Sequence, residues 1–434
     1  MLGISSSAAA AAVAADASLL HVPTFTDIPI LNVSALIDAK ASDDSAAYAK
    51  AIADLTMAMY DASKSVGFFL VSGHGIDTAL IDDMFAMARR FFALPVDVKK
   101  TTSVSHNRGY MALGEENLNS DAQYDGDIKE ALDIGPEKED APLPDDASEL
   151  DRLLAYRLRQ RNRWLSDDVL PGFKQVSMKY YDKVNELAEI VLEVLASAMG
   201  QSTAFFSDRV KVPGTMGQLR MVRYPAAPGM QSSRLSCGAH SDYGCITLLA
   251  ADTPGLQIYL SPEVVKRHFP ARACSDLQAH HESIKYASGG QPGGSWAWVP
   301  VVPGTFIVNL GDMISRWTNR TFKSTLHRVV HVDTDLGDRI SLPFFVDCDF
   351  DTEIRVLPAF LPGSGKLSDP KEHVLHFPKP ITMGQHLALM FSSTFPELPA
   401  VRKETQRLTP SPVVHVTLRD EDGQEHELAE SAGA

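Results

Sequence analysis

The sequence predicts a protein of the α+β class with a mainly β core. Three observations support this prediction: helical periodicity dominates residues 45–199, seven short runs rich in β-branched and aromatic residues follow Pro213, and one more apolar helix ends near residue 395. Strands at such spacing indicate a sandwich or a barrel. The 434 residues, 44% of them hydrophobic, are enough for a large core.

The N-terminal half is predicted to alternate strands with helices after a short tail. Residues 1–22 are rich in Ser and Ala and precede the first basic residue, Lys40, so they lack the charged region of a targeting sequence and we expect a disordered tail. Residues 23–205 are expected to form a helical region. Its strands are predicted at 28–31, 67–71 and 131–134, and its helices at 45–65, 80–92 and within 156–199.

The second half is predicted to hold the β core over residues 213–350. Between residues 261 and 295 the strand pattern lapses and ends in a glycine-rich run, which indicates an insertion on a hairpin. Residues 351–434 are expected to contain a helix at 383–395 and a polar extension. The predicted strands of the core cover residues 219–224, 245–250, 256–260, 296–299, 305–310, 327–332 and 340–346.

Composition excludes several classes of partner. The chain has 55 acidic and 40 basic side chains, a net charge of −15, and no dense basic cluster, so a nucleic acid is not the expected partner. No apolar run reaches the roughly 18 to 20 residues needed to cross a bilayer. Four cysteines without a Cys-x-x-Cys spacing indicate reduced thiols in a cytoplasmic protein. They are Cys237, Cys245, Cys274 and Cys348.

Three residues form a candidate metal site. If residues 239–243 are extended, the side chains of His240 and Asp242 project to one face and can bind the same ion. His327, from a distant strand, would be the third ligand. Two imidazoles and one carboxylate on one face of an octahedron leave three positions open, as in non-haem Fe(II) oxygenases. Taken alone, a His-x-Asp pair is equally typical of polar residues at a strand end.

A second candidate feature follows His327 by 12 positions. Arg339 and Ser341 are expected on one face of the next strand. A guanidinium fork beside a hydroxyl suits a carboxylate held in a partly buried pocket, because arginine is always charged and binds in a bidentate manner. A surface arginine on a strand is the competing interpretation.

These motifs stand in an order that resembles the 2-oxoglutarate and Fe(II)-dependent dioxygenases of the isopenicillin N synthase-like family. The resemblance covers about residues 27–396 and implies a double-stranded β-helix, or jelly roll, with a helical N-terminal region and a C-terminal helix. Among the matching segments are Gly67-Phe68-Phe69, Arg223-Tyr224-Pro225, Ala239-His240-Ser241-Asp242, Asn309-Leu310-Gly311-Asp312, Ser324-Thr325-Leu326-His327 and Asp338-Arg339-Ile340-Ser341.

The resemblance also implies roles for the candidate residues. His240, Asp242 and His327 match the catalytic Fe(II) ligands of the family. Arg339 and Ser341 match the pair that holds the distal carboxylate of 2-oxoglutarate.

Three further positions bear on the resemblance. Tyr224 matches a family tyrosine whose hydroxyl reaches the distal carboxylate of 2-oxoglutarate. Many relatives carry Asn two residues earlier, where this chain has Val222, so a co-substrate contact is expected to be missing or replaced.

His327 follows His240 by 87 residues, and we attribute the excess over the family's usual interval to the 261–295 insertion. A lid or a partner surface is the alternative for that insertion.

The implied function is a dioxygenase that uses Fe(II), 2-oxoglutarate and O₂ to hydroxylate or desaturate a small organic metabolite, with release of succinate and CO₂. Two alternatives remain open: an Fe(II) oxidase of the same fold that ignores 2-oxoglutarate, and a metal-free ligand-binding protein. Arg339 and Ser341 do not exclude the oxidase, whereas an intact ligand triad argues against the binding protein. The expected partner is a small-molecule substrate, without nucleic acid or membrane. Substrate identity and oligomeric state stay open.

Overall fold

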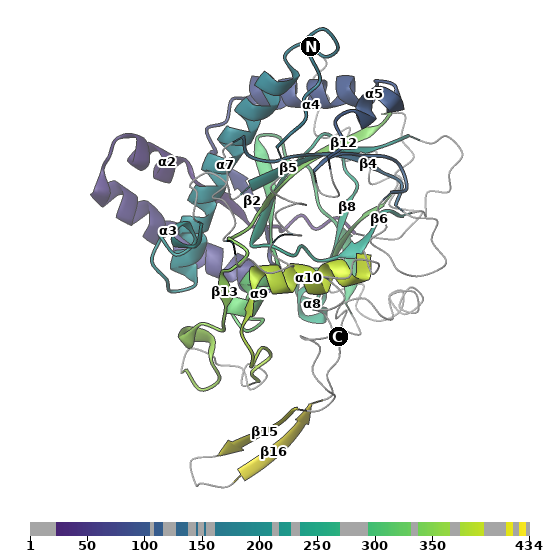
Figure 1. The fold of residues 1–434 in the computed structure, drawn as a ribbon. Coiled ribbons are helices and arrows are strands. Elements are labelled where there is room, and N and C mark those ends of the chain that lie inside the picture. The colour runs from purple at the N-terminus through teal and green to yellow at the C-terminus, as the bar shows by residue number, and fades with distance from the viewer. Residues whose placement is uncertain are drawn as a thin grey trace.

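Two β-sheets that face one another form the centre of the molecule (Figure 1). The computed structural model describes residues 23–104, 108–115, 127–137, 145, 152, 161–210, 217–226, 235–269, 294–330, 337–364, 374–394, 414–419 and 425–430. The strands of the larger sheet are β1 (Ile30–Asn32), β2 (Phe68–Ser72), β3 (Gly109–Met111), β4 (Glu130–Ile134), β5 (Gly217–Tyr224), β7 (Ile246–Ala251), β10 (Thr305–Leu310) and β12 (Arg339–Val346). Those of the smaller sheet are β6 (Leu235–His240), β8 (Leu256–Leu260), β9 (Ser295–Trp298) and β11 (His327–Val330).

The order of strands interleaves the two halves of the chain. The larger sheet runs β1-β2-β10-β7-β12-β5-β4-β3, and the smaller sheet runs β6-β11-β8-β9. Strands β1 and β2 are parallel, whereas all other pairs are antiparallel. Strands β1 to β4 precede the predicted division between residues 205 and 213, and β5, β7, β10 and β12 follow it, yet all of them belong to the same sheet. A domain boundary at this division stays a prediction.

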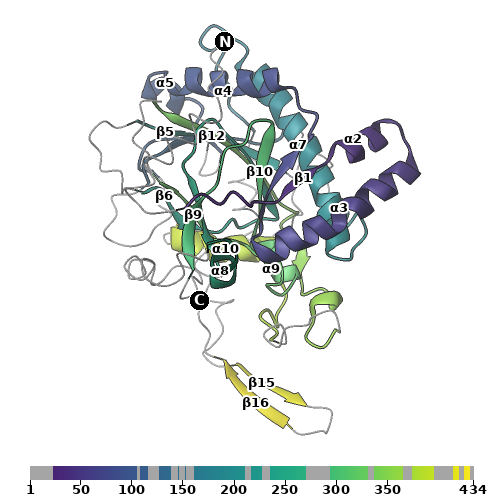
Figure 2. The ribbon, with the colours of Figure 1, turned by 180° about the vertical axis from the view of Figure 1, so that it is seen from behind.

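Helices cover the outer face of the larger sheet. Helix α4 contacts β12, α7 contacts β5 and α3 contacts β2. Figure 2 shows α2 and α3 beside α7, at the edge of the sheet that β1 forms. The helices of this layer are α2 (Ser34–Ala41), α3 (Ser45–Ser65), α4 (Thr78–Phe92), α5 (Val96–Lys100) and α7 (Phe173–Ala198).

The boundaries of α3 follow from its end residues. Asp44 caps the first turn, because its carboxylate accepts hydrogen bonds from the backbone N–H groups of Ala46 and Ala47. Past the helix, Gly67 has a φ of +69°, and a Cβ there would lie 2.1 Å from the carbonyl oxygen of Lys323. Only glycine fits this left-handed, crowded position, and the chain leaves it as β2.

Alternation along β12 separates a core face from an inner face. The apolar side chains of every second residue are buried against the helices, and the residues between them point toward the smaller sheet. The space between the two sheets therefore receives polar groups from β12. The residues of the core face are Ile340, Leu342, Phe344 and Val346, and those of the inner face are Arg339, Ser341, Pro343 and Phe345.

The α+β class and the jelly-roll core are confirmed. The helix at 45–65 and the strand at 305–310 match α3 and β10 residue for residue, and the predicted C-terminal helix is α10 (Met383–Thr394). The periodic stretch 156–199 resolves into α7, preceded by non-helical chain from residue 161. Strand β6 and the short helices α8 (Pro262–His268) and α9 (Asp312–Trp317) were not predicted.

Several predictions concern residues outside the described ranges. The predicted tail at 1–22 lies wholly outside the described ranges, and so do residues 270–293 of the predicted insertion at 261–295. Helix α8 lies at the start of this insertion, and β9 begins at its end. The polar extension contains a hairpin of β15 (Val414–Arg419) and β16 (Glu425–Glu430). Two short strands, β13 (Glu353–Ile354) and β14 (Ile381–Thr382), pair ahead of α10. None of the described helices has both the length and the apolar character that crossing a membrane requires.

Phe173 tests the packing of the helical layer. Its ring is fully buried, stacks on Phe91 of α4 at 5.3 Å between centroids, and meets Trp164 edge to face at 5.1 Å. Phe173→Ala is expected to lower the free energy of unfolding by about 3–5 kcal/mol, measured by urea denaturation. The control Met57→Ala, at a side chain 67% exposed, should change it by about 0.5 kcal/mol or less. Equal effects of the two variants would contradict this packing.

Candidate metal centre

His240, Asp242 and His327 lie together at one edge of the two sheets. Strand β6 ends at His240 and β11 begins at His327, and these two residues are direct partners in the ladder. The Oδ1 atom of Asp242 is 3.8 Å from His240 Nε2 and 3.5 Å from His327 Nε2. One ligand atom from each residue falls within 4.8 Å of the others, so the three can bind a single ion.

Strand β6 ends at His240, and the chain then crosses from the smaller sheet to β7 in the larger one, with a bend at residues 243–245. Asp242 precedes this bend, and the backbone N–H of Asp312 donates to the Asp242 carbonyl at 2.8 Å. Only residues 239 and 240 of the 239–243 stretch belong to a strand. The carboxylate of Asp242 nevertheless comes within 3.8 Å of the His240 imidazole, as a separation of two residues along an extended chain predicts.

Both imidazoles are oriented by backbone carbonyl groups. The Nδ1 atom of His240 is 2.8 Å from the carbonyl oxygen of Gly238, and that of His327 is 3.0 Å from the carbonyl oxygen of Thr325. A carbonyl can only accept, so each Nδ1 carries the proton and donates it. The lone pair of each Nε2 is then left to face the point between the three side chains, as a metal ligand requires.

The carboxylate of Asp242 is oriented by the larger sheet. Its Oδ2 atom accepts from the Asn309 amide at 2.7 Å and from the Thr247 hydroxyl, which leaves Oδ1 directed at the histidines. Burial alone raises the pKa of this carboxyl group. The interactions with His327 and His240 and the hydrogen bond from Asn309 outweigh burial, and the pKa lies below its usual range. The group is therefore an anionic ligand at neutral pH.

This donor set fits an Fe(II) ion. Two neutral imidazole nitrogens and one carboxylate oxygen form the facial triad of non-haem Fe(II) oxygenases, with open positions for further ligands. Each ligand also has an outer hydrogen-bond partner, a feature that metal sites share. The neighbours Thr247 and Asn309 had no role assigned from the sequence, although both lie in segments that follow the family pattern.

Asp347 is a further carboxyl group near the triad. It follows β12, and a Cβ at Gly244 would lie only 1.8 Å from its Oδ1 atom, so the turn after Asp242 packs directly on this carboxyl group. Burial, and secondarily the charge of Asp242, raises the pKa of Asp347 to about 7. Asp347 was not predicted from the sequence, because its position beside the triad depends on the pairing of distant strands.

Arg339, Ser341 and Tyr224 also lie together, on the inner face of the larger sheet. Arg339 and Tyr224 are direct partners across β12 and β5, and the guanidinium carbon of Arg339 lies 4.9 Å from the centre of the Tyr224 ring. Tyr224 hydrogen-bonds to the Ser341 side chain, and burial raises the pKa of its phenol, so the hydroxyl keeps its proton at neutral pH. The three side chains therefore present hydrogen-bond donors in one place.

The guanidinium of Arg339 uses only part of its hydrogen-bond donors within the described residues. Its Nε atom donates to the carbonyl oxygen of Thr253 at 3.1 Å, whereas its buried Nη1 atom has no hydrogen-bond partner among the described residues. Gly255 makes room for the guanidinium, since a Cβ there would lie 2.8 Å from Arg339 Nε. Buried donors are almost always paired in folded proteins. An unpaired guanidinium nitrogen inside the fold suits an anionic ligand such as a carboxylate.

Val222 supplies no polar group to this region. Its side chain is 3% exposed and packs in an apolar cluster with Met111, Ala131, Tyr224, Cys237 and Val329. It is the ladder partner of Ser341. At the position where many relatives carry Asn, the wall is aliphatic, in line with the predicted loss of a contact.

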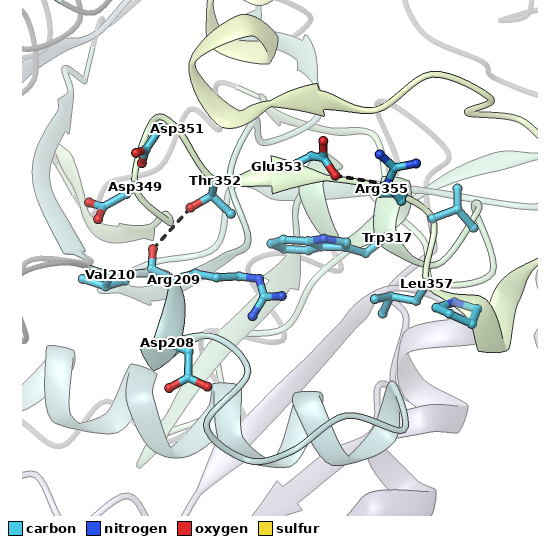
Figure 3. A pocket seen from close by; sticks show the side chains of 12 residues that line it. Asp208, Arg209, Val210, Trp317, Asp349, Asp351, Thr352, Glu353, Arg355 and Leu357 are labelled. Atoms are coloured by element: carbon cyan, nitrogen blue, oxygen red, sulfur yellow. Dashed lines mark hydrogen bonds and ion pairs between the residues drawn. The ribbon is translucent and has the colours of Figure 1, made fainter. Parts of the chain in front are cut away.

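A separate pocket of about 610 Å³ lies away from these residues (Figure 3). One side is formed by residues 208–210, including the end of the 3₁₀ helix Ser207–Arg209, and the other by residues of the 349–358 segment. Trp317, the last residue of α9, lies between them. None of the triad residues, Arg339, Ser341 or Tyr224 lines it, so it is not part of the candidate site.

Fold and site together define a class: a jelly roll that presents two histidines and one carboxylate for a single metal ion. Comparison with known families agrees. The family described as non-haem dioxygenase in morphine synthesis, N-terminal, matches residues 28–167, and the 2OG-Fe(II) oxygenase superfamily matches residues 277–347, which include His327, Arg339 and Ser341.

Similar proteins carry matching names. A 2-oxoglutarate-dependent dioxygenase of Didymella fabae is 31% identical over 304 residues, 68% of this chain and 80% of its own length. A homoarginine-6-hydroxylase of Glycine max is 29% identical over 77% of this chain and 89% of its own length. A putative 2OG-Fe(II) oxygenase family protein from Caulobacter crescentus has a solved structure with a TM-score of 0.59 and 25% identity, covering 84% of this chain and 98% of that one.

A full-length Neurospora crassa protein crystallised with alpha-KG shares the fold at a TM-score of 0.59 and 23% identity, over 88% of this chain and 98% of that chain. This chain belongs to the 2OG-Fe(II) oxygenase superfamily. It is an oxidoreductase of a family that uses Fe(II), 2-oxoglutarate and O₂.

Asn309 tests how the carboxylate ligand is held. Asn309→Ala leaves Oδ2 of Asp242 with Thr247 as its remaining side-chain donor, so the ligand loses part of its fixed orientation. The Fe(II) dissociation constant is expected to rise about 10- to 100-fold, measured by anaerobic titration of the metal-free protein. An unchanged dissociation constant would mean that Asn309 does not orient the ligand.

Proposed function

We propose that this chain is a 2-oxoglutarate-dependent dioxygenase in which His240, Asp242 and His327 bind Fe(II) and Arg339, Ser341 and Tyr224 bind the distal carboxylate of 2-oxoglutarate. The observation that carries the proposal is the buried, unpartnered Nη1 of Arg339, on the sheet that faces the triad. A five-carbon diacid that reaches from the metal to Arg339 would give this donor its missing acceptor.

The chemistry comes from the bound metal and co-substrate, and the chain holds them. Fe(II) with O₂ supplies oxidising chemistry in which 2-oxoglutarate is converted to succinate and CO₂ while a C–H bond of the substrate is hydroxylated or desaturated. The guanidinium of Arg339 can bind both oxygens of the distal carboxylate, and the protonated hydroxyl of Tyr224 can donate to it. Asp242 and the two histidines fix the metal in one orientation relative to that anchor.

Water exclusion is assigned to the apolar cluster around Val222. This cluster joins Val222 and Tyr224 of β5 to Cys237 and Val329, which lie on the strands that carry the histidines, and its members are at most 8% exposed. Dry walls around a metal site keep reactive species from water and strengthen every electrostatic contact inside. The loss of a polar contact at Val222 would be offset by a drier pocket.

The proposed substrate is a small organic metabolite. The names of similar proteins support this class: a homoarginine-6-hydroxylase of Glycine max, a Neurospora crassa structure that contains thymine, and a dioxygenase for auxin oxidation from rice. These substrates share small size and little else. The net charge of −15 also disfavours a nucleic-acid substrate.

A cytoplasmic location is part of the proposal. Cys237, Cys245 and Cys348 are free thiols, and the sulfur atoms of Cys245 and Cys348 lie 3.7 Å apart without a disulfide. The chain has four cysteines and no Cys-x-x-Cys spacing, and such cysteine usage is typical of reduced thiols in a reducing compartment.

Arg339 variants test the function directly. Arg339→Ala should raise the dissociation constant of 2-oxoglutarate at least about 30-fold, because it removes one partner of a buried charge pair. Arg339→Lys should recover only part of this loss, since a point charge cannot replace a two-pronged fork. Calorimetry on the iron-loaded protein under argon measures both.

A matched control is Arg355→Ala, at an arginine whose side chain is 66% exposed, and it should leave the affinity for 2-oxoglutarate unchanged. Native affinity in Arg339→Ala would show that Arg339 is not the anchor for 2-oxoglutarate. A native protein that binds Fe(II) but not 2-oxoglutarate would favour the Fe(II) oxidase.

A further inference from the structure

Two charged side chains are buried beside His240, and neither belongs to the proposed triad or the proposed co-substrate anchor. Asp127 and Lys129 are 5% and 6% exposed, and Lys129 Nζ lies 3.0 Å from Asp127 Oδ2. Taking two charges out of water costs more than a simple ion pair returns, so a buried pair is poorly explained by stability alone. The other contacts of this pair indicate what it does.

The pair faces the space between the sheets. Asp127 and Lys129 stand four and two residues before Ala131 on the chain that enters β4, so all three are expected on one face of an extended segment. Ala131 belongs to the apolar cluster that contains Tyr224 and Cys237. The ammonium group of Lys129 contacts the sulfur of Cys237, another member of this cluster, and therefore lies at the inner wall.

Asp127 is connected to the first histidine through one residue. Its Oδ1 atom accepts a hydrogen bond from the backbone N–H of Gly238 at 3.0 Å. The carbonyl oxygen of the same Gly238 accepts the Nδ1 proton of His240 at 2.8 Å. A carboxylate, a backbone residue and an imidazole are thus linked in series, and the last member presents Nε2 to the metal position.

The strand is irregular at this residue. The register of β6 against β11 shifts between the pairs His327 with His240, Val329 with Cys237 and Val330 with Leu235, so the ladder is interrupted around Gly238. Such bulges redirect side chains next to active sites. Lys129 Nζ also contacts the sulfur of Cys237 at 3.3 Å, so the buried pair binds two successive residues of the irregular segment.

We propose that Asp127 is a positioning residue for the metal centre: it holds Gly238 so that the Gly238 carbonyl fixes the tautomer and the ring orientation of His240, and Lys129 compensates the buried negative charge. The inference rests on the proposed role of His240 as a metal ligand. It assigns Asp127 no contact with the metal, the co-substrate or the substrate.

The chain offers a matched control on the same strand. Asp133 and Arg220 form a second buried pair, with Arg220 Nε at 2.7 Å and Nη2 at 2.9 Å from the two carboxylate oxygens. Asp133 is 1% and Arg220 8% exposed. This pair connects β4 with β5, and Asp133 also accepts a hydrogen bond from Gln218 of β5 at 3.1 Å.

The test is anaerobic Fe(II) titration of the full-length, metal-free variants. Asp127→Ala should raise the Fe(II) dissociation constant about 10- to 100-fold, the usual effect of removing a group that orients a ligand. Asp133→Ala should lower the unfolding temperature yet leave the Fe(II) dissociation constant unchanged. The ¹⁵N spectrum of the His240 ring should show mixed tautomers in Asp127→Ala and a single Nδ1–H tautomer in the native protein and in Asp133→Ala.

A milder variant guards against a failure to fold. The amide of Asp127→Asn keeps an oxygen for the Gly238 N–H but turns an N–H₂ toward the Lys129 ammonium, so an intermediate loss of affinity is expected. The double variant Asp127→Asn with Lys129→Met removes that conflict and should bring the Fe(II) dissociation constant back to within about threefold of native.

Two outcomes separate this inference from the proposed function. If the Asp127 variants lower the unfolding temperature but bind Fe(II) as tightly as the native protein and keep a single His240 tautomer, the pair is structural and the inference is wrong. If His240→Ala itself leaves Fe(II) binding unchanged, the ligand assignment fails, and the positioning role fails with it.

Discussion

The buried carboxylate of Asp242 connects the two sheets at the place where the proposed chemistry occurs. One oxygen is held by Asn309 and Thr247 of the larger sheet, and the other faces His240 and His327 of the smaller sheet. An unpaired buried carboxylate would be costly, and here each side of the group has partners that compensate its burial. To keep these contacts of the Asp242 carboxylate, the chain must leave β6 at a fixed position and the two sheets must stay at a fixed distance. Both imidazoles must also point toward the carboxylate.

On the inner face of the larger sheet, the hydrogen bonding of Arg339 is incomplete among the described residues. The helices cover an apolar face of β12, so its alternate residues direct Arg339 and Ser341 inward, where Tyr224 from β5 joins them. Nη1 of Arg339 is buried beside these two hydroxyl groups and has no acceptor among the described residues. This arrangement fits the proposed anchor for the distal carboxylate of 2-oxoglutarate, and local departures from full pairing are expected at functional sites.

Much of this could be predicted from the sequence, because period and motif are local properties. The 3.6-residue period predicted α3, and short runs of β-branched and aromatic residues predicted β10 and β12. The ligands and the arginine were identified from short motifs and a family resemblance. The end of β6 at His240 was not predicted, because the place where a strand ends depends on which sheet the next strand joins.

Asp127, Thr247, Asn309 and Asp347 were not identified from the sequence, because their roles depend on contacts across the fold. Asp127 reaches Gly238 over 111 positions and Asn309 reaches Asp242 over 67, and no periodicity links such residues. Short helices such as α9, with six residues, also hold too few turns to show a period.

The most direct test of the account is an anaerobic titration of the native protein with Fe(II) and then 2-oxoglutarate, followed by visible absorption. The account predicts a metal-to-ligand charge-transfer band that saturates at one iron and one 2-oxoglutarate per chain and is absent from Asp242→Ala. Stoichiometric iron binding without that band would contradict the 2-oxoglutarate site, and a band of native intensity in Asp242→Ala would contradict the metal centre.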